Sequence, residues 1–225
     1  MADGFVAKEV TFENTAGVNM NQSVAMANEG KYSAFYKCRF SGYQDTLYVK
    51  KGIQFFRECI IYGTVDFIFG DASALFQNCS VYARRPRQGQ SNTITAQKRE
   101  SVKDVSGIVL QNCTIDAAPD LQPMLNVVRT YLGRPWRNYS TTVIMQSYLG
   151  ELIDPSGWLE WPGHSLDKLY YAENANDGPG ANTSHRVGWT HRNISYTDAK
   201  KFTARAFLNG SEWIPSTGIP CNLDL

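Results

Sequence analysis

Short strand-like runs anchored by cysteine recur along the first half of the chain and constrain its fold most. The runs are "FVAKEVTFEN", "SAFYKCRFSG", "QFFRECIIYG", "SALFQNCSVYA" and "GIVLQNCTIDA", and four of them share an apolar pair, two positions, Cys, one position and an apolar residue. Their anchors lie 28, 21, 20 and 34 residues apart, at Val10, Cys38, Cys59, Cys79 and Cys113. A repeat of about 20 to 30 residues with short strands is typical of a solenoid. Because long amphipathic helical periodicity is absent from residues 1–150, we expect a right-handed parallel β-helix rather than helical repeats.

The predicted interior is a ladder of Phe, Val, Ile, Leu and Cys side chains, with Gly, Asn and Asp supplying the turns. Four cysteines fit this ladder as small apolar residues. Cys79 and Cys113 would alternatively form a disulfide if they lie on adjacent coils, and the sequence leaves that choice open. No cysteine belongs to a CxxC pair, and His164, His185 and His191 come late in the chain, so a zinc site is not expected.

Two aspartates in apolar, aromatic surroundings share one position in the repeat. Asp45 follows Cys38 by seven residues, and Asp66 follows Cys59 by seven. Equivalent positions on neighbouring coils stack at the parallel-strand spacing of about 4.8 Å. Two carboxylates at that separation repel each other, which raises the pKa of a member of the pair unless a cation intervenes. Repulsion within such a pair destabilises the folded protein, so the pair is not expected unless it has a function. The repeat therefore predicts a functional site on one outer face.

Bulk composition is that of an ordinary soluble globular protein, and 225 residues suit one substantial domain. A net charge of +1 gives no global field for nucleic acid or an anionic membrane, and no apolar run reaches the roughly 18 residues of a membrane span. No signal peptide is visible, because "MADGFVAKEV" lacks an apolar core. A high density of glycosylation sequons nevertheless favours a secreted glycoprotein. These sequons include Asn78, Asn112, Asn138, Asn182, Asn193 and Asn209.

Motifs spread over nearly the whole chain carry a family resemblance. The four that bear on chemistry are "NQSVAM" with Gln22, "YQDTL" with Gln44 and Asp45, "GTVDFIFG" with Asp66, and "YLGRPW" with Arg134 and Trp136. Agreement also runs from "GFVAKEVTFENTAG" through "DPSGWLEWPG" and "YYAENANDGPGA" to "FLNGSEWIPSTGIP". The chain thus resembles the plant-type pectin methylesterases, the carbohydrate-esterase family that removes methyl esters from homogalacturonan.

The resemblance implies a right-handed parallel β-helix with long loops on one side, a short helical or irregular C-terminal segment, and a site on one outer sheet. By similarity, Asp66 would be the nucleophile that attacks the methyl-ester carbonyl at C6 of a galacturonate residue. Asp45 would be the general acid that assists methanol departure, and then the base that activates water. Gln22 and Gln44 would donate hydrogen bonds to the oxyanion. No cofactor and no metal ion are implied.

Three further side chains complete the implied site. Arg134 would offer a planar guanidinium fork to Asp66. Trp136 would present a flat ring to the apolar face of a sugar. The segment "GWLEWPG" adds Trp158 and Trp161, of which Trp161 is our candidate for the sugar cleft.

The implied partner is homogalacturonan, the pectin polysaccharide of the cell wall, and a proteinaceous pectin methylesterase inhibitor is a further candidate. Neither nucleic acid nor a membrane is expected as a partner. Catalytic domains of the family carry further coils, a capping segment and a G-x-Y-x-E motif ahead of the region where this chain begins. We therefore expect residues 1–225 to be a single catalytic domain, truncated at its N-terminus and located in the apoplast.

Two other functions stay open on sequence grounds. Another β-helix pectin enzyme, a polygalacturonase or a pectate lyase, would also use carboxylates, as a pair or around Ca²⁺. The two glutamines favour acyl chemistry, because amide donors suit an oxyanion. The second alternative is a catalytically impaired homologue that binds pectin. The basic run "ARRPRQGQ", with Arg84, Arg85 and Arg87, would either meet the polyanionic product or form a solvated turn.

Overall fold

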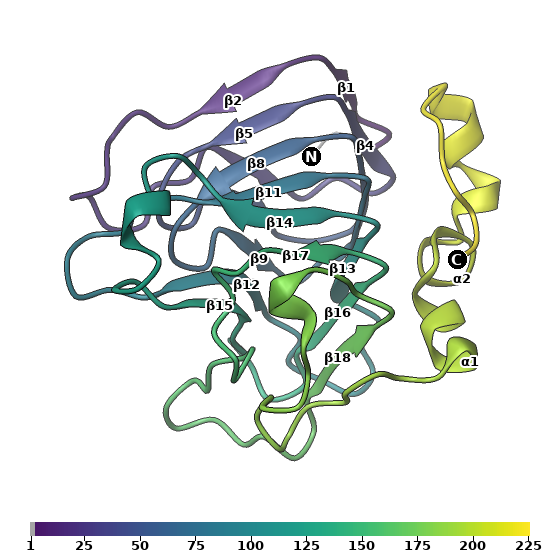
Figure 1. Cartoon of the computed structure of the whole chain (residues 1–225). Coiled ribbons are helices and arrows are strands. Elements are labelled where there is room, and N and C mark those ends of the chain that lie inside the picture. The colour runs from purple at the N-terminus through teal and green to yellow at the C-terminus, as the bar shows by residue number, and fades with distance from the viewer. Residues whose placement is uncertain (1–2) are drawn as a thin grey trace.

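The chain coils into a three-sided parallel β-helix (Figure 1). The computed structural model describes residues 3–225. Strands of successive coils pair in parallel within each sheet, so that Phe56 lies opposite Phe76 although they are 20 positions apart. The expectation of a parallel β-helix is confirmed, and with it the continuous parallel sheets.

The three sheets are named A, B and C. Sheet A contains, in spatial order, β1 (Val6–Lys8), β4 (Ser33–Tyr36), β7 (Ile53–Arg57), β10 (Ser73–Gln77), β13 (Gly107–Gln111), β16 (Thr141–Met145) and β18 (Tyr170–Asn174). Sheet B contains β2 (Thr11–Glu13), β5 (Arg39–Ser41), β8 (Ile60–Gly63), β11 (Ser80–Ala83), β14 (Thr114–Ala117) and β17 (Tyr148–Leu149). Sheet C contains β3 (Met26–Asn28), β6 (Leu47–Val49), β9 (Ile68–Gly70), β12 (Asn92–Gln97) and β15 (Thr130–Gly133).

The interior is a column of side chains stacked in register from coil to coil. The rings of Phe35 and Phe56 stack with centroids 4.7 Å apart, and those of Phe56 and Phe76 stack at 4.4 Å. All three rings are fully buried. Burial of one such side chain contributes about 1.5–3 kcal/mol, so the phenylalanine column is a main source of the solenoid's stability.

The cysteines mark the corners between sheet A and sheet B. The residue before each corner cysteine adopts the left-handed conformation, with φ of 52° at Lys37, 53° at Glu58, 55° at Asn78 and 53° at Asn112. The following residues, Cys38, Cys59, Cys79 and Cys113, are buried in the core. All five cysteines are free thiols, so the disulfide alternative for Cys79 and Cys113 is not realised. In-register side chains on neighbouring parallel strands lie about 4.8 Å apart, wider than the roughly 3.8 Å that a disulfide prefers between its Cβ atoms.

The irregular spacing of the repeat comes from loops around sheet C. Between β11 and β12 the loop of residues 84–91 is inserted, and residues 98–106 connect β12 to β13. These two insertions account for the 34-residue interval between Cys79 and Cys113. The loop of residues 118–129 before β15 includes the short 3₁₀ helix η1 (Gln122–Met124).

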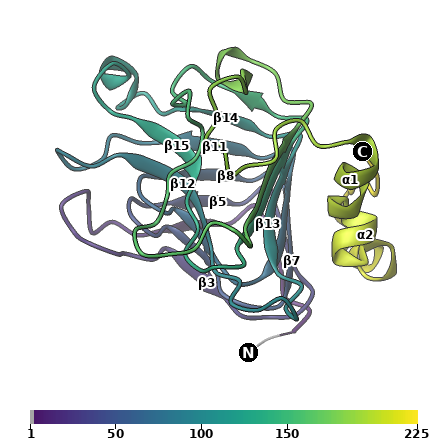
Figure 2. The same ribbon diagram turned by 90° about the horizontal axis from the view of Figure 1, so that it is seen from below.

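The C-terminal segment is helical and packs on the outer face of sheet A (Figure 2). It contains α1 (Tyr196–Ala199), η3 (Lys200–Phe202), α2 (Ala204–Leu208), η4 (Gly210–Glu212) and η5 (Ile214–Thr217). One more 3₁₀ helix, η2 (Pro179–Ala181), precedes this segment in the sequence. Leu208 and Ile214 join Phe55, Leu75 and Val109 in a second apolar cluster outside the coil. In the described part of the chain, none of the helices has the length and apolar character needed to cross a bilayer.

Candidate active site

The two aspartates lie side by side on sheet C, at the entrances to β6 and β9. Leu47 pairs with Ile68, and the Asp45 N–H donates to the Val65 carbonyl at 2.9 Å, which sets Asp45 opposite Asp66. Both residues have positive φ, 62° for Asp45 and 51° for Asp66. A left-handed conformation is uncommon for residues with a side chain, and such strained positions cluster at functional sites. As the register inferred from the cysteines predicts, the pairing of β6 with β9 places the two aspartates at neighbouring positions on the outer face.

Asp66 is held by two neighbours that come from later coils. Arg134 donates from Nε to Oδ1 at 2.8 Å and from Nη2 to Oδ2 at 2.6 Å. The Thr93 hydroxyl donates to Oδ1 at 2.6 Å, and the Asp66 N–H donates back to the same hydroxyl at 2.9 Å. Asp66 is only 6% exposed. The bidentate pair and the hydroxyl fix the carboxylate in one orientation.

Arg134 reaches Asp66 because β15 lies close against β12. The Arg134 N–H donates to the Thr95 carbonyl at 2.9 Å. The preceding residue is Gly133, where a Cβ would overlap the Thr95 hydroxyl. Glycine is thus required for the close approach of the two strands. The guanidinium also lies 4.1 Å above the Trp161 ring, a cation–π contact that supports its position.

Asp45 differs from Asp66 in its surroundings. It is half-buried and forms no hydrogen bond through its carboxylate with another residue of 3–225. Burial, followed by the negative charge of Asp66, raises the pKa of Asp45 to about 7, while Arg134 opposes that rise. A carboxyl that titrates near neutral pH can both donate and accept a proton under ordinary conditions.

Gln22 and Gln44 lie on successive coils beside the aspartates. The Ser23 N–H donates to the Gln44 carbonyl at 3.1 Å, so the segment containing Gln22 lies on the segment containing Gln44. Gln22 is exposed and Gln44 is half-buried. Among the described residues neither side-chain amide has a hydrogen-bond partner, which leaves both amides free to donate.

Aromatic rings form a platform on β6 and β9, the two strands that follow the aspartates. Tyr48 and Phe69 follow the two aspartates by three residues, and their rings stack at 4.4 Å. Trp136 lies 6.0 Å from Phe69 and 6.5 Å from Tyr48 between ring centroids, with Lys98 Nζ 5.1 Å over its ring. Trp136 is half-exposed, so the platform is open to a ligand. Tyr48 and Phe69 are additions to the residues expected from the sequence.

Trp158 has a structural role instead. It is fully buried, and its Nε1–H donates to Glu173 at 3.1 Å. Glu173 also pairs with the buried Arg186. Of the two tryptophans in "GWLEWPG", only Trp161 therefore lies at the site. Within residues 3–225 no group of three or more His, Cys, Asp or Glu side chains is arranged to hold a metal ion.

Comparison with known proteins identifies the family. The Pectinesterase family model matches residues 1–211. The chain belongs to the pectinesterase family. Its resemblance to the pectin methylesterases is thereby confirmed.

Relatives of this pectinesterase include the probable pectinesterase/pectinesterase inhibitor 17 of Arabidopsis thaliana, 52% identical over 96% of this chain and 43% of the relative. Pectinesterase 2 of Citrus sinensis is 48% identical over 98% of this chain and 44% of its own length. Among solved structures, a pectin methylesterase from carrot superposes with a TM-score of 0.98 at 47% identity, covering 99% of this chain and 71% of that one. The chain spans less than half of the length of these curated relatives.

The unusual environment of Asp45 predicts a pH-dependent stability for this pectinesterase. Because folding raises the pKa of Asp45 to about 7 from an unfolded value near 3.9, its contribution to stability is full below about pH 4 and is lost as the pH rises through 7. Asparagine does not titrate. Asp45→Asn is therefore expected to be more stable than the parent at pH 8 by about 1–2 kcal/mol, after allowance for solvent screening. The advantage should shrink towards pH 4.

Urea unfolding at pH 4, 6 and 8 measures this difference directly. A gap between the variant and the parent that stays constant across the three pH values would contradict the assigned pKa of Asp45.

Proposed function

We propose that this chain hydrolyses methyl esters of homogalacturonan, giving pectate and methanol. The observation that carries the proposal is the unlike pair of neighbouring carboxylates. Asp66 is oriented by Arg134 and Thr93, while Asp45 titrates near neutral pH. Membership of the pectinesterase family supports an ester as the substrate.

The first half of the proposed reaction transfers the acyl group to the protein. The Asp66 carboxylate attacks the C6 carbonyl carbon of a methyl galacturonate residue and forms a tetrahedral oxyanion. The free amides of Gln22 and Gln44 donate hydrogen bonds to that oxygen, and one such donor is worth about 3 kcal/mol. When the C–O bond to methoxide breaks, protonated Asp45 donates its proton, so methanol leaves as a neutral molecule. The product is a mixed anhydride between galacturonate and Asp66.

The second half returns the protein to its starting state. Asp45, now ionised, removes a proton from a water molecule while the oxygen attacks the galacturonyl carbonyl. The anhydride bond breaks, which releases Asp66 as a carboxylate and the galacturonate as a free acid group. Asp45 holds the proton again. One carboxyl thus serves as acid and then as base, which its pKa of about 7 permits.

The aromatic platform supports a sugar ligand. Tyr48, Phe69 and Trp136 present apolar faces next to the carboxylates. Aromatic rings with a few convergent polar groups are typical of ligand sites. Trp161 contributes through Arg134, whose guanidinium stacks on it.

We further propose that the protein works outside the cell, on the pectin of the plant cell wall. Five of the named sequon asparagines are exposed and so accessible to glycosylation, namely Asn112, Asn138, Asn182, Asn193 and Asn209. A proteinaceous pectin methylesterase inhibitor is a proposed partner. The names of several relatives couple a pectinesterase to such an inhibitor.

Methanol release separates the proposed function from its alternatives. Incubation of the 225-residue chain with highly methylated pectin is expected to release methanol without new reducing ends. New reducing ends would instead indicate a hydrolase of the polysaccharide backbone, and unsaturated ends a lyase. Binding of pectin without methanol would leave a binding protein.

A further inference from the structure

The two carboxylate oxygens of Asp66 are not equivalent. Each oxygen of an ionised carboxylate can accept about two hydrogen bonds. Oδ1 accepts one from Arg134 Nε at 2.8 Å and one from the Thr93 hydroxyl at 2.6 Å, so both of its acceptor positions are used. Oδ2 accepts one from Arg134 Nη2 at 2.6 Å, and within residues 3–225 it has no other donor. One lone pair of Oδ2 is therefore left for a bond to another molecule.

The Thr93 hydroxyl is fixed in place by the pairing of neighbouring coils. The Thr93 N–H donates to the Thr64 carbonyl at 3.1 Å, which sets β12 against the segment that leads to Asp66. The Asp66 N–H donates to the Thr93 hydroxyl at 2.9 Å, and the hydroxyl donates its single proton to Oδ1. Successive hydrogen bonds of this kind polarise and strengthen one another. The proton is thus directed at Oδ1 and is not shared with Oδ2.

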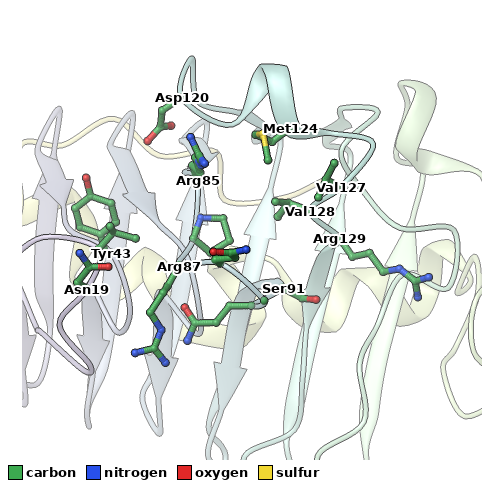
Figure 3. A pocket seen from close by; sticks show the side chains of 15 residues that line it. Asn19, Tyr43, Arg85, Arg87, Ser91, Asp120, Met124, Val127, Val128 and Arg129 are labelled. Atoms are coloured by element: carbon green, nitrogen blue, oxygen red, sulfur yellow. The ribbon is translucent and has the colours of Figure 1, made fainter.

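The Thr93 side chain is closed off from a ligand. Thr93 is 1% exposed. An open cavity of about 810 Å³ lies at the start of the strands of sheet C, with walls that include Tyr43, Ser91 and Arg129 (Figure 3). Thr93 follows Ser91 by two residues and is not part of that lining. Any influence of the Thr93 hydroxyl on a reaction therefore passes through Asp66.

We infer that Oδ2 is the atom of Asp66 that attacks the ester, and that Thr93 is the positioning residue that reserves it for this role. The inference rests on the proposed function, because it concerns the same covalent step. Attack by Oδ1 would first have to break a charge-assisted hydrogen bond, which is about twice as strong as a neutral one. Oδ2 forms the bond to C6 with its free electron pair. Oδ1 then becomes the carbonyl oxygen of the mixed anhydride.

Thr93 also contributes to the second half of the reaction. When the bond between Oδ2 and C6 breaks, its electron pair returns to Asp66, and the negative charge is shared by both oxygens. The Thr93 hydroxyl binds an ionised oxygen more strongly than the neutral carbonyl of the anhydride. It therefore stabilises Asp66 as a leaving group and speeds deacylation. Acylation gains only the orientation, because it starts from the ionised carboxylate.

Thr93→Val keeps the shape of the side chain and removes the hydroxyl. Its kcat for methanol release from highly methylated pectin is expected to fall about ten- to a hundredfold, the effect of losing one hydrogen bond to a charged group. KM should stay within about twofold, because the hydroxyl does not contact the substrate. Thr93→Ser retains the donor and should keep kcat within about threefold of the parental value. A loss in Thr93→Ser as large as that in Thr93→Val would contradict the role of the hydroxyl.

Slow deacylation has a kinetic signature that a general loss of structure lacks. With a nitrophenyl ester of a galacturonate oligomer, Thr93→Val is expected to release about one nitrophenolate per molecule in a burst and then to turn over slowly. Because an unfolded fraction would reduce the burst, a full burst also reports that the site is intact. Linear release at a reduced rate would overturn the role of Thr93 in deacylation.

A matched control makes the same substitution at a buried threonine elsewhere. Thr142 on β16 is fully buried, and within the described chain its hydroxyl has no hydrogen-bond partner. Thr142→Val should leave kcat within about twofold of the parental value, because no bond to the site is lost. An equal loss in Thr142→Val would assign the effect to packing and overturn the role of Thr93.

A crystal structure of the acylated protein locates the attacking oxygen directly. Asp45→Asn, treated with the nitrophenyl ester, should carry the galacturonyl group on the Asp66 oxygen that does not contact Thr93. A galacturonyl group on the oxygen bonded to Thr93 would overturn the inference. The proposed function fails separately, because a parent chain that releases no methanol and forms no acyl adduct would refute the esterase. Equal methanol release by the parent and Thr93→Val would refute the inference alone.

Discussion

Asp66→Asn is expected to lower kcat/KM for methanol release at least about ten-thousandfold, because the covalent route has no substitute in the site. Asparagine keeps the shape of the side chain and can still accept a hydrogen bond from the Thr93 hydroxyl. It removes the negative charge and the attacking oxygen. The loss should therefore appear in kcat, with KM changed little, because the aromatic platform and the glutamines are untouched.

The kinetic result can be interpreted only if the Asp66→Asn variant is folded. Asp66 is 6% exposed and paired with Arg134, so far-UV circular dichroism and urea unfolding are needed beside the kinetics. A folded Asp66→Asn variant that keeps more than about a tenth of the parental kcat/KM would contradict the nucleophile assignment.

Arg134→Met is expected to reduce both stability and activity. Methionine matches much of the side-chain volume but leaves the Asp66 carboxylate buried beside Thr93 without its cation. Breaking a buried ion pair in this way costs about 3–5 kcal/mol, and the 22% exposure of the Arg134 side chain lowers the expected loss to about 2–3 kcal/mol. The methanol-release kcat should fall about a hundred- to thousandfold, because a misplaced attacking group costs that much in rate.

Two further variants show whether the planar fork matters. Arg134→Lys keeps the charge but cannot make two parallel hydrogen bonds, so its kcat should lie between those of the parent and Arg134→Met. Arg137→Met removes a neighbouring arginine that pairs with Glu100 at 3.1 Å on the surface, and it should cost less than about 1 kcal/mol. Equal stability of Arg134→Met and the parent would contradict the role assigned to this ion pair.

The sequence could locate the two aspartates because the cysteines report the register. Cys38 and Cys59 occupy the same corner of successive coils, and only short connections (residues 42–46 and 50–52) separate the strands between them, so equal offsets become neighbouring positions. The same reasoning extends to Tyr48 and Phe69, which are also 21 residues apart and pair across β6 and β9. They were not predicted as site residues, because neither carries a catalytic group.

The register of the later coils cannot be predicted from residue spacing, because loops of different length are inserted between their strands. Thr93 follows Asp66 by 27 residues rather than 21, because the loop of residues 84–91 is inserted before β12. No residue count alone could set this hydroxyl against the carboxylate. Arg134 was inferred from the family resemblance, since another loop separates it from the preceding coil.

The left-handed conformation at the corners between sheets A and B could be predicted from the sequence only in part. Asn78 and Asn112 tolerate positive φ well, and their positions before cysteine favour a turn. Lys37 and Glu58 adopt the same conformation without any preference for it, because pairing on both sides of the corner forces the local backbone. The disulfide question was likewise settled by geometry that only the coil register provides.

The central claim is that Asp66 becomes acylated, and trapping the acyl group tests it most directly. A nitrophenyl ester of a galacturonate oligomer needs no proton for its leaving group, so Asp45→Asn should acylate normally but deacylate slowly for want of a base. We expect a burst of about one nitrophenolate per protein molecule, and a galacturonyl mass on the peptide that contains Asp66 after acid quench. Linear release without a burst, together with an unmodified Asp66 peptide, would contradict the account.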